Sequence, residues 1–453
     1  MLKGRTAILG LTAWCIAEVG AAASPLTVHE WGTFTSFQDS DGVTIAGINV
    51  DDEPVPWFVH RLGSVPATGP GNLPARWSQG APSCHPEVTM RLETPVLYFY
   101  PPPGWSAAAF DVQASFAGGW LTEYFPAATA DRGDFPKTLD SQARGSLLWR
   151  QVRLDPDAKS LLHDTTYRVW LAPRKVNATV VSNPETKEAE KYLFYRGVGH
   201  LDAPLTFGAR NGAIDIALRG DEPQLTTLPR VWLVEVLPDG RVRYQALPAG
   251  GRSISAAAFA PATAGMKSSL EGLRGELADA LIGQGLYADE AAAMLETWKL
   301  SYFESQGLRA FFLLPQGWTD AHLPLSISTP AEVTRVMVGR VELVSAHQRA
   351  MLAKLQALPE ASIPAVPLYV QDRSVIAAGL ATKGPLSKLY RKSGREVPES
   401  LLAYESLGRF RDALLAHEWK IADGNQRARL RRVLDSYSAC VWSLTQEPLT
   451  TGR

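Results

Sequence analysis

Residues 28–37 read VHEWGTFTSF, and this stretch predicts the first strand of a β domain. Its Thr, Phe and Trp content is typical of strands. Successive strand side chains point to opposite faces, so His29, Trp31 and Thr33 share one face and Glu30 lies on the other. The adjacent histidine and glutamate are therefore not expected to act in one site unless a bulge intervenes. HEWGT also lacks the second histidine of the H-E-x-x-H zinc motif.

The face that carries Glu30 also carries the apolar residues Val28 and Phe34. A carboxylate in such a place is either exposed at the strand end or buried with a partner. For the buried alternative we expect an arginine partner, with Arg91 and Arg196 as candidates.

Short runs rich in β-branched and aromatic residues, bounded by Pro, Gly and Asn, recur between residues 26 and 248. We interpret them as strands: 96–100, 110–116, 167–171, 192–195, 213–218 and 231–237. Asp239-Gly240 and Asn211-Gly212 are typical hairpin turns. The pattern predicts an antiparallel β-sandwich or barrel.

After a loop at 246–265 the apolar period changes from two to 3.6. A capping box at Ser268 and Glu271 predicts a helix start, and strands follow at 310–314 and 333–344. In the second of these strands the alternation changes at Gly339, which predicts a β-bulge there.

The fold class expected is α+β, with an antiparallel β-sandwich-like domain, a helical insertion and a helical C-terminal region. We divide the chain into a signal peptide (1–23), a β-rich domain (24–248), a helical insertion with strands that could complete the β domain (249–345), and a helical C-terminal region (346–453).

The first 23 residues combine Lys3 and Arg5, an apolar stretch over 7–17 and the small residues 21–23. That layout is typical of a secretory signal peptide and predicts a periplasmic or secreted protein. No later stretch has the roughly 18 apolar residues of a membrane helix. The net charge of −1 gives no general attraction to nucleic acid, although residues 383–433 hold 12 Lys and Arg against 6 Asp and Glu, which we interpret as a solvated helical face.

Removal of the signal peptide leaves two cysteines, Cys84 and Cys440. In an oxidising compartment they would form one disulfide, and two separate buried thiols are the alternative.

Several ionisable residues lie within or beside aromatic strands and are candidates for acid–base catalysis: His29, Glu30, Glu93, His200 and Glu304. A pair of carboxylates among them would suit cleavage of a glycosidic bond. Candidate binding residues are Trp31, Arg196, Trp298 and Tyr302. The sequence has no G-x-S-x-G, P-loop, dinucleotide-binding or C-x-x-C motif.

An acidic stretch near the start of the chain offers oxygen ligands of the kind that Ca²⁺ prefers. The candidate ligands are Asp39, Asp41, Asp51, Asp52 and Glu53. The alternative is a solvated turn, since DSDG is a typical turn sequence without the rest of an EF-hand.

HEWGTFTS, RLETPVLYFY, YLFYRGVG and RVMVGRVE, together with the run at 294–315, resemble an uncharacterised family of exported bacterial proteins. The resemblance covers about residues 28–345. It implies export and a bacterial source, and it transfers no catalytic residue.

Two functional hypotheses follow. The first is an exported envelope or periplasmic protein that binds a polymer or a protein partner through an aromatic-rich β scaffold. The second is an extracellular polymer hydrolase or lyase that uses the His and Glu candidates, which requires those side chains to converge in one cleft.

Overall fold

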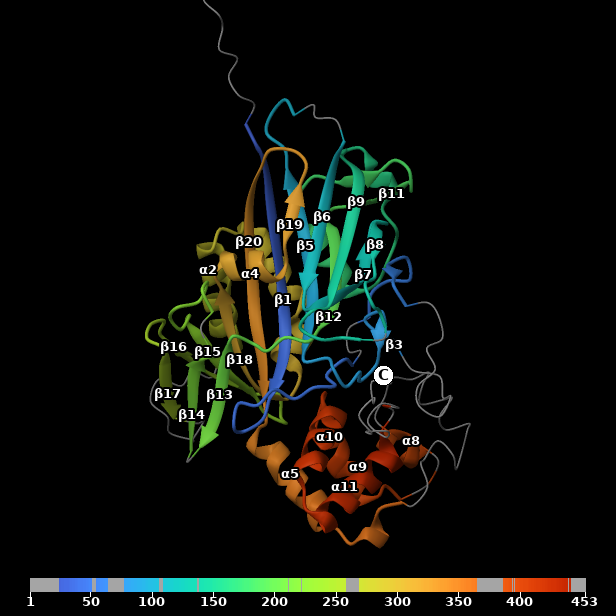
Figure 1. Ribbon diagram of the computed structural model, residues 1–453, viewed down its shortest axis with the longest axis vertical. Coiled ribbons are helices and arrows are strands. Elements are labelled where there is room, and N and C mark those ends of the chain that lie inside the picture. Colours follow the sequence, from blue (N-terminus) through green and yellow to red (C-terminus); the bar gives the residue numbers. More distant parts are fainter. Residues whose placement is uncertain are drawn as a thin grey trace, which may run out of the picture.

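The computed structural model describes residues 24–50, 54–63, 77–105, 109–136, 138–210, 212–220, 222–257, 269–364, 386–392, 394, 396–438 and 440. The fold is α+β, with large β-sheets above a group of C-terminal helices (Figure 1). The predicted signal peptide, Asp51, Asp52 and Glu53 lie outside the described residues.

A nine-stranded sheet forms the centre of the molecule. Its middle strands are β1 (Leu26–Gln38) and β20 (Ala331–Leu343), which pair in parallel along their whole length. The other pairs in this sheet are antiparallel. From one edge to the other the order is β16 (Val242–Leu247), β15 (Val231–Val236), β18 (Gly307–Leu314), β20, β1, β5 (Met90–Tyr100), β12 (Leu193–Gly199), β7 (Gly119–Phe125) and β2 (His60–Arg61).

Two smaller sheets cover one face of the central sheet. The first runs in the order β11 (Glu188–Glu190), β10 (Val181–Asn183), β9 (Arg144–Leu154), β6 (Phe110–Ala117) and β19 (Leu325–Ile327), with β8 (Thr129–Asp131) also paired to β9. The second is β13 (Leu205–Arg210), β14 (Ala213–Leu218) and β17 (Ser253–Ala257). Phe34 and Met337 of the central sheet share a hydrophobic core with Trp149 of β9 and Phe207 of β13. This arrangement is the predicted sandwich.

Helices cover the opposite face of the central sheet. Trp31 and Val336 pack in a second core with Leu273 of α2 (Leu270–Gly283) and Met294 of α3 (Ala288–Thr297). A π-helix, η4 (Lys299–Glu304), follows α3, and α4 (Gln316–His322) lies on the sandwich side. Three short helical segments lie between β9 and β10 in the chain: η2 (Ala158–Leu161), α1 (Arg168–Leu171) and η3 (Pro173–Lys175).

The C-terminal helices form a third core against one end of the central sheet (Figure 1). They are α5 (Ala346–Ala357), η5 (Glu360–Ser362), α8 (Leu386–Lys392), α9 (Glu399–Ser406), α10 (Arg411–Ile421) and α11 (Gly424–Tyr437). Phe37 at the end of β1 packs on Phe410 just before α10, with ring centroids 5.6 Å apart. A two-stranded ribbon, β3 (Trp77–Ser78) and β4 (Ala81–Pro82), lies off the main sheets.

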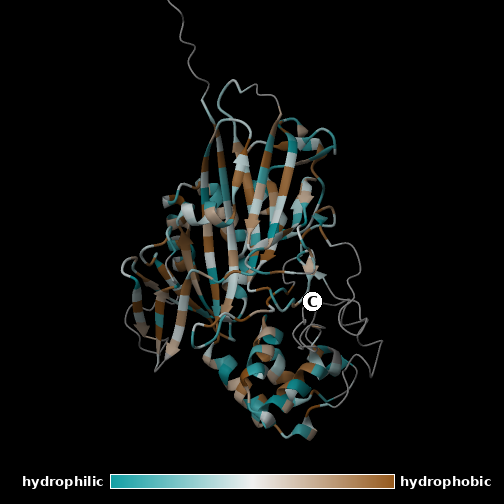
Figure 2. Cartoon of the chain, viewed as in Figure 1, coloured by the Kyte–Doolittle hydropathy of each residue, from teal (hydrophilic) through white to brown (hydrophobic). Residues whose placement is uncertain are grey.

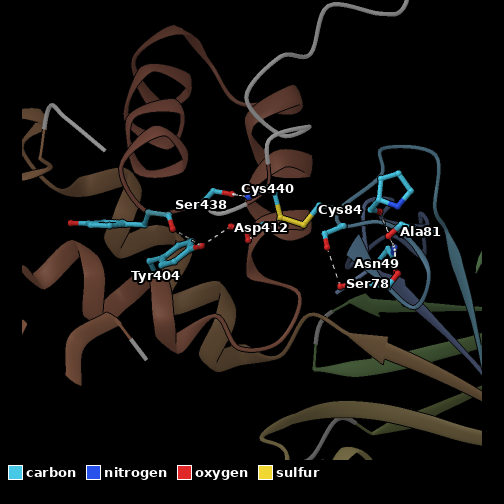
Figure 3. Close-up of a disulfide and its surroundings, with 11 residues drawn as sticks. Asn49, Ser78, Ala81, Cys84, Tyr404, Asp412, Ser438 and Cys440 are labelled. Carbon is cyan, nitrogen blue, oxygen red and sulfur yellow. Dashed lines mark hydrogen bonds between the residues drawn. A yellow bond between two sulfur atoms is a disulfide. The ribbon is translucent and has the colours of Figure 1, made fainter. Parts of the chain in front are cut away.

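The cysteine pairing predicted from the sequence is confirmed. Cys84 and Cys440 are 356 positions apart, and their Cα atoms lie 5.6 Å from one another in a disulfide. Figure 3 shows this bond between the β region and the C-terminal helices. It ties the last described residue to the loop before β5.

Three local predictions were wrong. β20 has no bulge at Gly339, because both of its neighbours keep an unbroken register there. The alternation changes because both faces of β20 are buried: Val336 and Val338 face the helices, whereas Val341 and Leu343 face the smaller sheets. Figure 2 shows hydrophobic residues recurring along the central strands.

The stretch 167–171 is a single helical turn, α1, and not a strand. Over so short a length, a run of apolar residues fits either a strand or a helix. Trp170 is buried, as the apolar run predicts. The helix predicted from Ser268 begins one residue later, because the Ser269 side chain accepts the hydrogen bond from Gly272 N.

Candidate binding groove

His29 and Glu30 lie on opposite faces of β1, as the alternation predicts. The ring of His29 faces α3, and its Nδ1 lies 2.8 Å from Oε2 of Glu290. The rings of Tyr100 and Tyr287 pack against the imidazole at 5.3 and 4.5 Å between centroids. Glu290 also accepts from the Tyr100 hydroxyl at 2.7 Å, so this histidine is held by a buried polar cluster.

Glu30 is buried on the sandwich side, and its arginine partner is Arg335. Arg335 Nε donates to Oε2 of Glu30 at 2.5 Å, and the Tyr195 hydroxyl donates to Oε1 at 2.5 Å. The candidates proposed from sequence were wrong, because Arg196 binds Glu123 and Arg91 lies 3.3 Å from Glu93. Burial alone would lower the pKa of Arg335, but the Glu30 carboxylate beside it raises that pKa overall, so Arg335 stays protonated.

The remaining acid–base candidates lie elsewhere. Glu93 is buried, and its Oε1 accepts from Arg409 at 2.8 Å. His200 is partly exposed at the end of β12, with Nδ1 2.7 Å from the carbonyl oxygen of Glu87. Glu304 is on the surface, 3.7 Å from Lys299. The five candidates therefore do not share a cleft, and the convergence that the hydrolase or lyase hypothesis requires is not observed among them.

The candidate binding residues Trp31, Arg196, Trp298 and Tyr302 are all buried. Trp31 is fully buried, and Trp298 stacks on Tyr302 with centroids 5.9 Å apart in the core beneath the helices. Tyr302 donates to Thr33 at 2.5 Å, and Arg196 is buried with Glu123. These aromatic rings were predicted to bind a ligand, but they fill the layer between sheet and helices, as tryptophans usually do.

The predicted calcium ligands are only partly described. Asp39 Oδ1 accepts from the backbone N–H groups of Asp41 and Val43, and Oδ2 lies 2.9 Å from His417 Nε2. This is the hydrogen-bonded turn that was the alternative to calcium for that segment. Among the described residues, one group of His, Cys, Asp and Glu atoms is close enough for a metal, namely Cys84, Asp412 and Cys440, and the disulfide uses both sulfurs.

A groove lies where the six-stranded sheet ends beside β20. Its volume is about 540 Å³, and it is lined by α4, β19 and the first part of β20: Gln316, Asp320, Pro324, Leu325, Ile327, Thr329, Ala331, Val333 and Arg335. Figure 1 shows β19 and α4 in front of the central strands. Arg335, the partner of Glu30, is one of these lining residues.

One side of the groove is an open strand edge. Among the described residues β19 is the last strand of its sheet and pairs only with β6, in the register Leu325–Ala114, Ser326–Gln113 and Ile327–Val112. Ser115 N donates to Pro324 O, and Ser328 N donates to Asp111 O. Bonds to β6 therefore fall on the even-numbered residues, and the backbone N–H and C=O groups of Leu325 and Ile327 point to the open edge.

The opposite side of the groove has fixed polar groups. Gln316 accepts from Arg335 N at 3.0 Å, and Arg335 Nη1 donates to Asp320 Oδ1 at 2.9 Å. Arg335 Nη2 is buried and has no hydrogen-bond partner within the described ranges. A buried donor of this kind normally needs an acceptor.

Sequence reasoning missed this site. Arg335 and Asp320 stand in ordinary strand and helix contexts, and LSI between Pro324 and Pro330 is too short to identify as a strand. The two prolines are the signal that could have marked an edge strand, since proline is confined to edges and strand ends.

Comparisons with known proteins leave the chain without an assigned family. No family model matches it, and no curated protein sequence does. The matching solved structures include the Fcho1 mu homology domain of Danio rerio with bound Eps15 peptide, at 10% identity over 71% of this chain and 98% of that chain, with a TM-score of 0.30. The yeast delta-COP-I mu-homology domain matches at 9% identity over 71% and 99%, with a TM-score of 0.25. Both TM-scores are low, and no functional conclusion follows from them.

Proposed function

We propose that this chain is an exported envelope protein that binds an extended segment of a polypeptide partner in the groove beside β19. The observation that carries the proposal is the open edge of β19, where two residues offer their backbone groups toward a groove of sufficient volume. Export rests on the signal-peptide pattern of residues 1–23, which stands as a sequence-based prediction.

A strand edge recognises any extended peptide by main-chain hydrogen bonds, and adjacent side chains supply selectivity. Leu325 and Ile327 pack their side chains toward the sandwich core, so their backbone geometry is fixed before binding. Natural proteins usually protect an open edge, because such an edge attracts other strands. An edge kept open beside a groove is therefore favoured as a docking site.

Arg335 adds a directional element to the groove. Its Nη2 group is a buried donor without a partner among the described residues, and a peptide carbonyl or a carboxylate supplies the missing acceptor. The exposed carboxylate of Asp320 beside it favours a donor on the ligand, such as a peptide N–H. This alternation of donor and acceptor is what the backbone of an extended peptide provides.

The test uses a random peptide library and the mature protein. Peptides that bind the wild type are measured against Ile327→Pro, which removes an N–H at the open edge and leaves the bonds to β6 in place. Ile327→Ala is the matched control, because it removes the same side chain and keeps the N–H. Loss of one peptide hydrogen bond is expected to weaken binding by about tenfold in the proline variant relative to the alanine variant.

Hydrogen exchange gives a second readout that needs no variant. Bound peptide is expected to slow exchange of the Leu325 and Ile327 amides. If the selected peptides bind Ile327→Pro and Ile327→Ala equally well, or if only envelope polysaccharides protect these amides, the proposed peptide partner is wrong.

A further inference from the structure

Three arginines meet one glutamate where the central sheet joins the C-terminal helices. Arg309 lies on β18, Arg340 and Glu342 lie on β20, and Arg409 lies just before α10. Arg309 and Arg340 are almost fully buried, at 1% and 0% exposure. We call these four residues the arginine cluster. So many buried guanidinium groups beside one carboxylate require an account of how their charge is balanced.

Two of the arginines share the single carboxylate of Glu342. Arg340 Nε donates to Oε1 at 2.8 Å, and Arg309 Nε donates to Oε2 at 3.3 Å. Arg309 Nη1 also donates to the carbonyl oxygens of Ser301 and Tyr302 at 2.8 Å, which ends the π-helix. Arg409 Nη2 lies 2.8 Å from Glu93 Oε1, and Arg91 Nη1 lies 3.3 Å from the same oxygen, so these two arginines share the Glu93 carboxylate.

Four arginines therefore face the two carboxylates Glu93 and Glu342, which leaves two positive charges in excess. Burial, together with the charges of Arg340 and Arg409, lowers the pKa of Arg309 to about 10. Arg309 is therefore still protonated at neutral pH. Burial raises the pKa of Glu342, but the three arginines outweigh burial and lower it overall, so the carboxylate is ionised as well.

The cluster encloses a small cavity. Its volume is about 20 Å³, and all four cluster residues line it together with Phe37, Gln306, Gln348 and Phe410, among others. A site of that size holds one particle slightly larger than a water molecule. The Arg340 side chain is fully buried. Its Nη1 atom forms no hydrogen bond within the part of the chain that the structure describes. Its ion pair with Glu93 Oε2 is 3.9 Å long, beyond hydrogen-bond distance.

We propose that this cavity binds one small monovalent inorganic anion of chloride size. The excess of positive charge sets the sign of the ligand's charge, and the volume of about 20 Å³ favours a monatomic ion over phosphate, sulfate and organic carboxylates. The bound anion accepts from Arg340 Nη1. It thereby links β18 and β20 to the residue that precedes α10, and stabilises the attachment of the C-terminal helices.

The first experiment compares chloride with gluconate at equal ionic strength. Tm is expected to rise with chloride concentration along a saturable curve, and not with gluconate, because gluconate is too large for the cavity. Crystals grown with bromide in place of chloride are expected to show an anomalous peak beside Arg340. Equal Tm in the two salts, or water only at the site, overturns the proposal.

Two variants locate the effect in the arginine cluster. Arg340→Gln removes one of the excess positive charges together with the Nη1 donor, and is expected to abolish the chloride-dependent rise in Tm. Because the loss of a buried charge can itself unfold the chain, Gln306→Glu is the decisive variant: Gln306 is exposed and lines the cavity, so its replacement leaves the buried arginines in place. The added carboxylate repels an anion, and about a tenfold higher chloride concentration is expected at half-saturation.

Gln142→Glu, on an exposed loop far along the chain, is the matched control and keeps the wild-type curve. A wild-type chloride curve in Gln306→Glu overturns the proposal.

Discussion

The Nε atom of Arg335 lies 2.5 Å from Oε2 of Glu30, in a pair that is 2% and 1% exposed. The two residues stand directly opposite one another in the parallel register of β1 and β20. The Tyr195 hydroxyl completes the site from β12, so three strands hold one carboxylate. A buried pair of this kind depends on both partners, because each charge is costly without the other.

We expect Arg335→Met to lower the free energy of unfolding by about 3–5 kcal/mol, because it leaves the Glu30 carboxylate buried without its cation. The measurement is urea unfolding followed by circular dichroism. The double variant Glu30→Leu with Arg335→Met should recover a large part of the loss, since no buried charge then remains. Asp320→Ala, which removes the exposed partner of the same arginine, should cost less than about 1 kcal/mol. A double variant no more stable than Arg335→Met would contradict this account.

His85 makes stability depend on pH. Burial, with a smaller contribution from the charge of His200, lowers the pKa of His85 from 6.5 to about 4. The unfolded chain therefore binds a proton between pH 6.5 and 4 that the folded chain does not bind, and stability falls as the pH falls through that window. The free energy of unfolding is expected to drop by up to about 3 kcal/mol from this group.

The control for this pH dependence is His85→Asn. In the wild type the backbone N–H of Glu87 donates to His85 Nδ1 at 3.2 Å, and the asparagine side chain keeps an acceptor oxygen there. Urea unfolding at pH 7.5 and pH 4.5 isolates the contribution of His85, because the other titrating groups are common to both proteins. The variant should lose less stability than the wild type between the two pH values. Equal losses would show that His85 is not the group responsible.

The sequence predicted the faces of β1 correctly because strand alternation is a local property. His29 and Glu30 lie on opposite sides, as two consecutive strand residues must. The partner of β1 was not predictable in this way. An apolar run such as that around Val336 indicates that a strand is buried. It does not indicate which strand lies beside it, or whether the two strands are parallel or antiparallel.

The groove could not be predicted because its parts are ordinary in isolation. Arg335 was one of many arginines, and only the pairing of β1 with β20 places it beside Glu30. The aromatic residues singled out as binding candidates were instead core residues, because a sheet covered on both faces needs large side chains on both. Trp31 and Tyr302 fill such positions.

Reduction of the Cys84–Cys440 disulfide should destabilise the C-terminal helices more than the central sheet. The bond closes a loop of 356 positions, and removal of a native disulfide typically costs about 2–5 kcal/mol. We expect hydrogen exchange in α9, α10 and α11 to accelerate on reduction, while exchange in β1 and β20 changes little. Cys84→Ser with Cys440→Ser is the control and should not respond to the reductant. Uniform acceleration across the sheet would contradict the idea that the bond acts mainly on helix attachment.

Gly197 and Gly275 should respond in opposite ways to the same substitution. An added Cβ at Gly197 in β12 would overlap the backbone carbonyl oxygen of Trp120 in β7, and a strand backbone has no rotamer by which to move aside. Gly197→Ala is therefore expected to cost about 3 kcal/mol. Gly275 lies on the exposed side of α2 with nothing within 4 Å of an added Cβ, so Gly275→Ala should stabilise by about 0.5–1 kcal/mol. Thermal and urea unfolding measure both, and a neutral Gly197→Ala would show that β7 and β12 are less closely packed than this contact requires.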